Sequence, residues 1–167
     1  MNDYLNRCIE IIEKSTDGLA DDVVRKRADG RWSVLEIVEH LQLAYSGTAK
    51  GLDRRLAAGA PSAKLSSLRN KVRKFVVVRI GYFPPGRQAP KFIMPKGDID
   101  LPTAIERARR DLEWLDRSAI RARERFGSVE ILDHPLLGAF TLDEWLRFHW
   151  IHTRHHEKQI RARTGRR

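Results

Sequence analysis

Residues 141–160 read TLDEWLRFHWIHTRHHEKQI, and they form the most informative helical pattern in the chain. At about 100° per residue, the apolar side chains of Trp145, Phe148 and Ile160 fall on one side of a helix. Four histidines share that side: His149, His152, His155 and His156. A buried imidazole nitrogen without a partner costs about 1–3 kcal/mol. The helix therefore needs polar partners for this face, and a metal ion or a network of hydrogen bonds would supply them.

Capping signals and apolar spacing predict further helices around this one. Ser33 with Glu36 and Thr141 with Glu144 form capping boxes, and Asp100 followed by Pro102 is typical of a helix start. The predicted helices span residues 2–17, 33–59, 66–80, 100–126 and 141–163, although the valines of the third also allow a strand. Residues 81–101, rich in Pro and Gly, predict a long irregular loop of a functional kind. These segments indicate an all-α bundle.

Length and cysteine content limit the fold and the kind of metal site. A chain of 167 residues is expected to form a single domain, residues 1–167, with a sizeable core. Cys8 is the only cysteine, which excludes an internal disulfide and a cysteine-based zinc site, and its place in an apolar pattern predicts that it is packed. The sequence shows no signal peptide and no transmembrane segment, so a cytoplasmic location is expected.

The positive charge is concentrated in one part of the chain. The net charge is +10, and residues 54–96 contain 11 Lys or Arg and no Asp or Glu. This block is either a solvated surface or a binding surface for an anionic partner. Nucleic acid is an unlikely partner, although the charge does not exclude it, because the block carries no recognition motif. Within it, residues 76–83 could pack, meet a second subunit or touch a membrane surface.

The spacing of the histidines limits which of them share an ion. His152 and His156 lie one turn apart and could bind one ion, while His149 and His152 form a competing pair. His155 lies toward the other edge of the face, and Gln159 is a candidate hydrogen-bond partner for a ligand histidine. His40, on the predicted helix 33–59, could supply a third imidazole from a facing helix.

Two stretches resemble a known family. Residues 31–41, RWSVLEIVEHL, resemble the first histidine motif of the DinB-like (DinB/YfiT) superfamily. Residues 134–145, HPLLGAFTLDEW, and 148–160, FHWIHTRHHEKQI, resemble its closing motif, and the resemblance covers nearly the whole chain. It implies an up-and-down four-helix bundle, with an additional short helix and the long loop in this chain, that often forms a homodimer and holds one divalent ion with three histidines.

Carried onto this chain, the resemblance implies that His40, His152 and His156 are the metal ligands. His149 and His155 occupy positions that the family does not generally use for the triad, so they and Gln159 are expected to support the ligands. Imidazole donors favour zinc, nickel or iron. Glu36 is explained by capping and Glu39 is expected to be solvated, so no catalytic base is identified.

The resemblance implies two kinds of activity. Some family members are metal-dependent thiol transferases or isomerases that use low-molecular-weight thiols, and others are hydrolases. We therefore expect a divalent-metal-dependent enzyme that transfers a small thiol or hydrolyses a small molecule. The alternative is a non-catalytic metal-binding module, active in stress response or interaction, whose residues 54–96 bind an anionic partner.

Overall fold

The computed structural model describes residues 1–28, 30–61, 67–83 and 89–166. The described chain is mostly helical and contains one small sheet of two strands. Parts of the sequence prediction lie outside the described residues, namely the start of the third helix at residue 66, residues 84–88 of the long loop, and Lys64 and Arg87 of the basic block. No helix in the described parts of the chain has the length and apolar character needed to cross a membrane.

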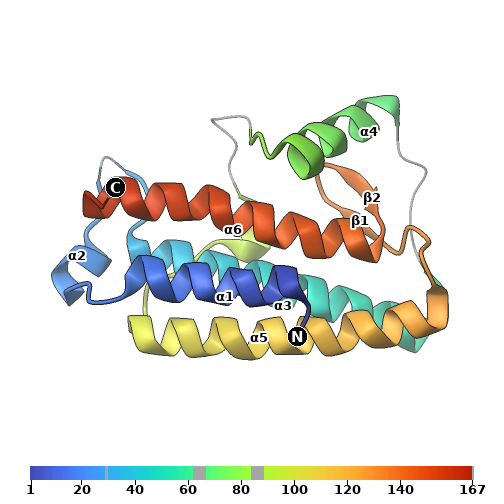
Figure 1. Cartoon of the computed structure of the whole chain (residues 1–167), viewed down its shortest axis with the longest axis horizontal. Coiled ribbons are helices and arrows are strands. Elements are labelled where there is room, and N and C mark those ends of the chain that lie inside the picture. The colour runs from blue at the N-terminus through green and yellow to red at the C-terminus, as the bar shows by residue number, and fades with distance from the viewer. Residues whose placement is uncertain (29, 62–66, 84–88, 167) are drawn as a thin grey trace.

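Four long helices lie side by side along the molecule (Figure 1). They are α1 (Asp3–Thr16), α3 (Val34–Ala58), α5 (Leu101–Phe126) and α6 (Leu142–Thr164). Helix α3 packs mainly against α5, and α1 packs mainly against α6. Their shared core is made of fully buried apolar side chains, among them Leu5, Ile12, Leu41, Leu112 and Leu115.

The predicted caps are present at three helix starts. The Ser33 hydroxyl accepts a hydrogen bond from the Glu36 N–H at 3.2 Å, and the Glu36 carboxylate accepts from the Ser33 N–H at 2.9 Å. Thr141 and Glu144 make the same pair of bonds at 3.2 and 2.9 Å. Asp100 accepts from the Thr103 N–H at 2.7 Å. Because these bonds satisfy backbone groups that a helix end leaves free, the starts of α3, α5 and α6 follow from local sequence.

The prediction of an all-α fold was wrong for residues 132–140. Strands β1 (Leu132–His134) and β2 (Gly138–Phe140) form an antiparallel hairpin there. The indole N–H of Trp145 donates to the Leu132 carbonyl at 3.1 Å, which fixes the hairpin against α6. Two short helices were also not predicted, α2 (Asp21–Arg25) and the 3₁₀ turn η2 (Lys91–Ile93).

Helix α4 (Leu68–Phe75) continues into the π-helical turn η1 (Val76–Ile80). Together they lie above α6 and the hairpin in Figure 1, and the strand alternative for this segment is not adopted. The Lys74 ammonium donates to Glu130 at 3.1 Å, to Glu144 at 2.9 Å and to the Ala139 carbonyl at 2.8 Å. One basic residue of the 54–96 block is thus used to attach α4 to the rest of the fold.

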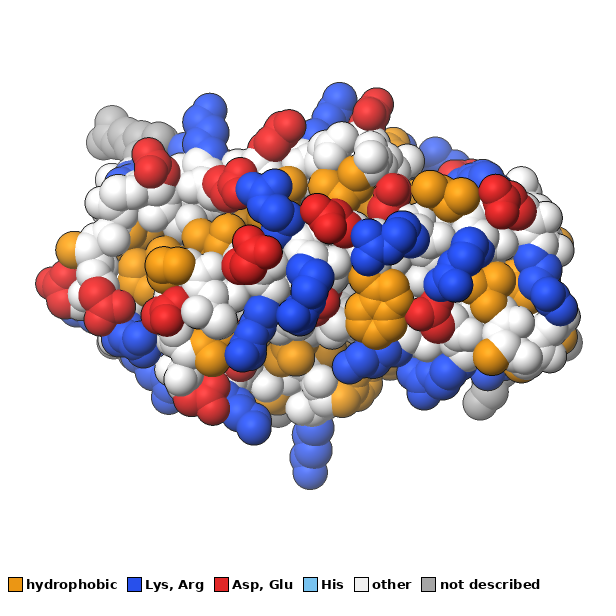
Figure 2. Space-filling model, turned by 90° about the horizontal axis from the view of Figure 1, so that it is seen from below, with side chains coloured by type: hydrophobic (Ala, Val, Ile, Leu, Met, Phe, Trp, Pro, Cys, Tyr) orange, Lys and Arg blue, Asp and Glu red, His pale blue; other side chains and the backbone are white. Residues whose placement is uncertain are grey.

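The face of the molecule that lies away from α4 carries side chains of both charges. Figure 2 shows the face seen from below, where basic and acidic side chains are mixed and apolar side chains are scattered between them. Such a mixture is typical of an ordinary solvated surface.

Candidate metal centre

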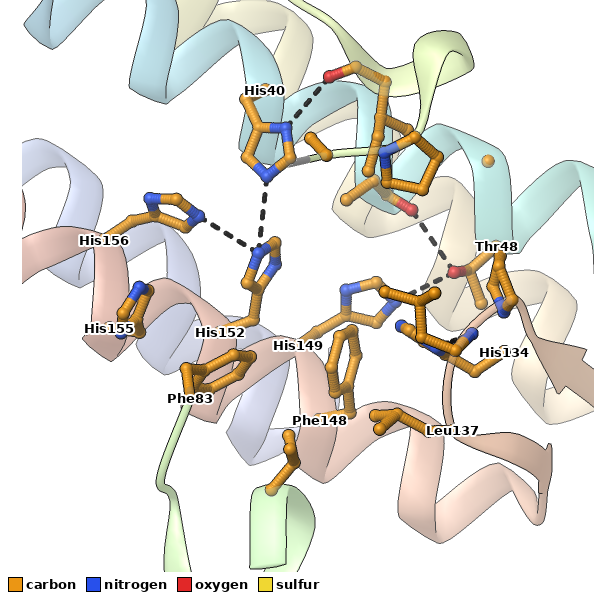
Figure 3. A pocket seen from close by; sticks show the side chains of 18 of the residues that line it. His40, Thr48, Phe83, His134, Leu137, Phe148, His149, His152, His155 and His156 are labelled. Carbon is orange, nitrogen blue, oxygen red and sulfur yellow. Dashed lines mark hydrogen bonds between the residues drawn. The ribbon is translucent and has the colours of Figure 1, made fainter. Parts of the chain in front are cut away.

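Three histidines from two helices converge on one point. His40 on α3 and His152 and His156 on α6 are buried, and one ring nitrogen of each lies within 4.8 Å of the others. The Nε2 atom of His152 is 3.3 Å from that of His40 and 3.1 Å from that of His156 (Figure 3). Bonds of about 2.0–2.1 Å at a tetrahedral ion would separate two ligand nitrogens by about 3.3 Å. The spacing of the three nitrogens therefore suits a divalent ion.

Hydrogen bonds to the other ring nitrogens orient two of these imidazoles. The Nδ1–H of His40 donates to the Ile93 carbonyl at 2.9 Å, and the Nδ1–H of His156 donates to Gln159 Oε1 at 3.0 Å. We assign these tautomers from the partners, because each partner atom is an acceptor. The assignment leaves a lone pair on each Nε2, which is the form that a metal requires.

Gln159 links His156 to His155. Its amide nitrogen lies 3.0 Å from His155 Nε2 and donates to it, while its oxygen accepts from His156. His155 and Gln159 thus lie beside a triad histidine and outside the triad. His152 has no such support, since its Nδ1 is buried without a partner among the described residues.

Burial keeps the triad histidines neutral. It lowers the pKa of His40, and it lowers the pKa values of His152 and His156 well below the ordinary value. Neighbouring histidines contribute in the same direction, because a charge on one opposes a charge on the next. At neutral pH the imidazoles are therefore unprotonated at one nitrogen and able to bind a cation.

His149 lies on the same helix but makes its hydrogen bond elsewhere. The Thr48 hydroxyl donates to the Ala44 carbonyl at 3.2 Å, so it accepts from His149 Nε2–H at 3.0 Å. The other ring nitrogen, Nδ1, has no partner among the described residues, and burial lowers the pKa of His149 to about 3. The expected supporting role of His149 would thus be exerted through α3 and not through a bond to the triad.

The segment around η2 covers the His40 side of the site. Besides the Ile93 carbonyl, it contributes the backbone N–H groups of Lys96 and Gly97, which donate to the Glu39 carboxylate at 2.9 and 2.7 Å. Glu39 is buried, so the expectation that it is solvated was wrong. The length of the loop predicts a functional role for this segment. Its sequence does not indicate that the Ile93 carbonyl would accept a hydrogen bond from His40.

A large cavity adjoins the triad. Its volume is about 1340 Å³, and the three triad histidines form part of its wall. The floor is a line of small residues on α3, Ala44, Gly47, Thr48 and Gly51. Among the described residues, and apart from the adjacent backbone of α3 itself, no atom lies within 4 Å of the place where a Cβ of Gly47 would stand, so the floor is open there. A small molecule in this cavity would lie directly beside the three nitrogens.

Aromatic side chains and basic residues complete the cavity wall. Phe83 lies with its ring centroid 4.7 Å from that of His155 and 5.8 Å from that of His152, and Phe148 stacks on His152 at 5.3 Å (Figure 3). At the other end, Arg54 of α3 and Arg73 of α4 line the same cavity. The cavity thus offers an apolar body with polar groups at a few places, as is typical of small-molecule sites.

The structure also places His134, the first residue of the closing motif, and Cys8. His134 lines the cavity from β1, and its Nδ1 accepts a hydrogen bond from the Leu136 N–H at 3.2 Å, so local bonding holds it. Cys8 is fully buried in the core, as predicted, and burial raises the pKa of its thiol to about 12. Cys8 is therefore not a nucleophile for a ligand in the cavity.

Comparison with known proteins identifies a family. No curated protein and no solved structure matches the chain. The family model described as "Protein of unknown function (DUF1569)" matches residues 12–163. This range covers most of the chain and includes all three triad histidines. The chain therefore belongs to the DUF1569 family.

Proposed function

We propose that the protein is a divalent-metal-dependent enzyme in which His40, His152 and His156 hold one ion. A small-molecule substrate occupies the adjoining cavity, and the reaction is transfer of a low-molecular-weight thiol or hydrolysis. The observation that carries the proposal is the convergence of three neutral, buried imidazole nitrogens on the wall of a cavity of about 1340 Å³. A structural metal site would have no need of such a cavity.

The proposal includes a DinB-like four-helix bundle as the fold. The side-by-side packing of α1, α3, α5 and α6 supports it, as does the position of the proposed ligand histidines on two helices of the bundle. Membership of DUF1569 is compatible with such a fold.

The chain's own residues prepare the site for this chemistry. Ile93 and Gln159 hold the protons of His40 and His156 on the nitrogens that face away from the triad. Phe83 and Phe148 reduce the access of water to the triad side of the cavity. When bound, a divalent ion would supply Lewis-acid chemistry toward a thiol or a water molecule. Zinc, nickel and iron are the ions that suit three imidazoles.

Metal analysis of protein purified without a histidine tag tests the site. We expect about one ion per wild-type chain and little or none in His40→Ala and His152→Ala. His134→Ala is the matched control, because His134 lines the same cavity outside the triad, and it should keep the ion. Full retention of the ion in both triad variants would contradict the proposal.

Two measurements then refine it. Gln159→Leu removes the acceptor of the His156 proton and should weaken metal binding by about 10–100-fold. A screen of thiols with electrophiles, and of hydrolysable esters and amides, should find a turnover that stops when the ion is removed. Turnover that continues unchanged in the metal-free protein would exclude a metal-dependent enzyme.

The non-catalytic alternative has less support. Lys74 of the basic block is occupied by Glu130 and Glu144, and Arg54 and Arg73 line the cavity, so these residues do not form one uniform surface. The homodimer and the cytoplasmic location remain part of the proposal, and sedimentation of the purified protein tests the first of them.

A further inference from the structure

Helix α4 and the turn η1 present apolar side chains to solvent. Leu68, Val72 and Phe75 follow one another at spacings of four and three, so they share one face of the helix. They are 78, 56 and 58% exposed. Ile80 and Tyr82, which follow in the chain, are 65 and 55% exposed. None of the residues of α4, all of which the structure describes, is buried.

The other face of the same segment holds it to the protein. Lys74 is bonded to the hairpin and to the start of α6, and Val77 and Val78 of η1 are buried. The Arg147 guanidinium also donates to the Val78 carbonyl at 2.8 Å. An amphipathic helix of a globular protein normally turns its apolar stripe to the core. Here the attached face of α4 carries a lysine, and the apolar side chains of the stripe remain more than half exposed.

The charge around the stripe indicates the nature of its partner. Arg69, Lys71 and Arg79 are exposed beside it, and residues 54–96 contain no acidic residue that could balance them. A second copy of the chain would bring a like surface of the same charge against this one, which electrostatic repulsion opposes. An anionic membrane offers negative head groups to the basic residues and acyl chains to the apolar ones.

We propose that this surface docks the protein on an anionic lipid membrane, with α4 lying in the plane of the interface. We call it the α4 surface, and it consists of Leu68, Arg69, Lys71, Val72, Phe75, Arg79, Ile80 and Tyr82. The proposal goes beyond the metal-dependent activity and does not depend on it. Because Val72 and Val76 also line the cavity, docking brings the membrane next to one wall of the cavity.

Co-sedimentation of the full chain with lipid vesicles tests the proposal. We expect binding to vesicles of phosphatidylcholine with phosphatidylglycerol, and much weaker binding to phosphatidylcholine alone. Replacement of Leu68, Val72 and Phe75 together by Ser should weaken binding by on the order of tenfold or more. Arg69→Glu with Lys71→Glu should weaken it by at least about fivefold for each charge and make it less sensitive to salt.

Control variants and measurements distinguish a loss of membrane docking from a loss of folding and from nonspecific hydrophobic binding. Ile120→Ser with Val129→Ser removes two apolar side chains that are 52 and 47% exposed elsewhere, and should leave vesicle binding unchanged. Circular dichroism and metal content should be the same in all variants, so that a failure of the metal site is recognised separately.

Three outcomes would overturn the proposal. The first is absence of binding to the anionic vesicles at low salt, and the second is equal binding by the triple Ser variant. The third is a wild-type protein that binds no vesicles but self-associates, with the association lost in the triple Ser variant, since this would assign the α4 surface to a second copy of the chain.

Discussion

Helices α6 and α4 depart from the usual distribution of side chains in opposite ways. Helix α6 turns His149, His152 and His156 into the interior, where apolar residues are expected. Helix α4 turns Leu68, Val72 and Phe75 into solvent, where polar residues are expected. The buried histidines lie beside other polar groups and a cavity, whereas the exposed apolar residues lie beside basic side chains. The first departure points to a small ligand inside the molecule, and the second points to a large partner outside it.

The two helices also differ in what holds them in place. Helix α6 is packed against α1 along the core, so its histidines are positioned by a rigid scaffold. Helix α4 is attached through Lys74 and the valines of η1. The contrast implies that the histidines of α6 and the apolar residues of α4 differ in their contributions to stability.

The largest expected effect is the stabilisation of α6 by a metal ion. Metal-free protein that receives zinc at about a hundredfold excess over the dissociation constant should gain about 3 kcal/mol in free energy of unfolding. His156→Ala lacks one of the proposed ligands and should gain little, while Phe75→Ser should gain as much as the wild type. Urea denaturation with and without zinc measures the effect. An equal gain in His156→Ala would show that zinc acts elsewhere.

The next effect is the dependence of stability on pH in the metal-free protein. Burial lowers the pKa of His149 from 6.5 to about 3, so between these values the unfolded chain binds a proton that the folded chain does not. Stability from this source is complete above pH 6.5 and decreases as the pH falls. Between pH 7 and pH 5 His149 alone should lower the free energy of unfolding by about 2 kcal/mol.

Denaturation at the two pH values measures this loss. His149→Phe keeps an aromatic ring between Trp145 and Tyr45 but has no group to protonate, so its stability should fall less steeply. An equally steep fall in His149→Phe would assign the pH dependence to other groups.

A smaller effect is expected where α4 is attached. Lys74→Met removes an ammonium that bonds two carboxylates and one carbonyl, and should cost about 1–2 kcal/mol. The cost is below that of a fully buried pair because Glu130 and Glu144 stay partly exposed. Lys71→Met, on the exposed side of α4, should change the free energy of unfolding by less than about 0.5 kcal/mol. Equal costs for the two variants would disprove the anchoring role of Lys74.

The smallest effect is expected from the apolar stripe itself. Phe75→Ser should change the free energy of unfolding by less than about 0.5 kcal/mol in the absence of lipid, because the side chain is 58% exposed. Leu112→Ala in the core should cost about 2–5 kcal/mol. Thermal denaturation of both variants measures the difference. A cost for Phe75→Ser near that of Leu112→Ala would show that the stripe serves the fold.

The helices could be predicted where their signals are local. Ser33, Asp100 and Thr141 cap helices through bonds to residues three positions away, so their sequence context was sufficient. Helix α2 was missed because it is short and because its N-cap residue, Ala20, makes no side-chain hydrogen bond. The hairpin was missed because each strand has three residues, and the pairing of Leu132 with Phe140 has no signal in such short segments.

The sequence predicted which three histidines come together, but not the groups that surround them. The spacing of His152 and His156 follows from helix geometry, and the resemblance supplied His40 as the distant third member. The partners of these residues arise from tertiary packing. Nothing in the sequence near Ile93 indicates that its carbonyl accepts from His40, or that Glu39 is buried under the backbone of Lys96 and Gly97.

Gly47 in the cavity floor affects both the stability of α3 and the size of the cavity. Gly47 lies in the middle of a helix of 25 residues, where glycine is less favourable than alanine by about 1 kcal/mol. Outside the adjacent backbone of α3, an alanine methyl group would meet no atom of the described residues within 4 Å, so their packing does not require glycine there. Glycine at position 47 therefore makes the helix less stable, but it leaves free the volume of the cavity that the three histidines also line. Substitutions at this position would trade helix stability against the size of the molecule that the protein accepts, which makes Gly47 a natural place to redesign its selectivity.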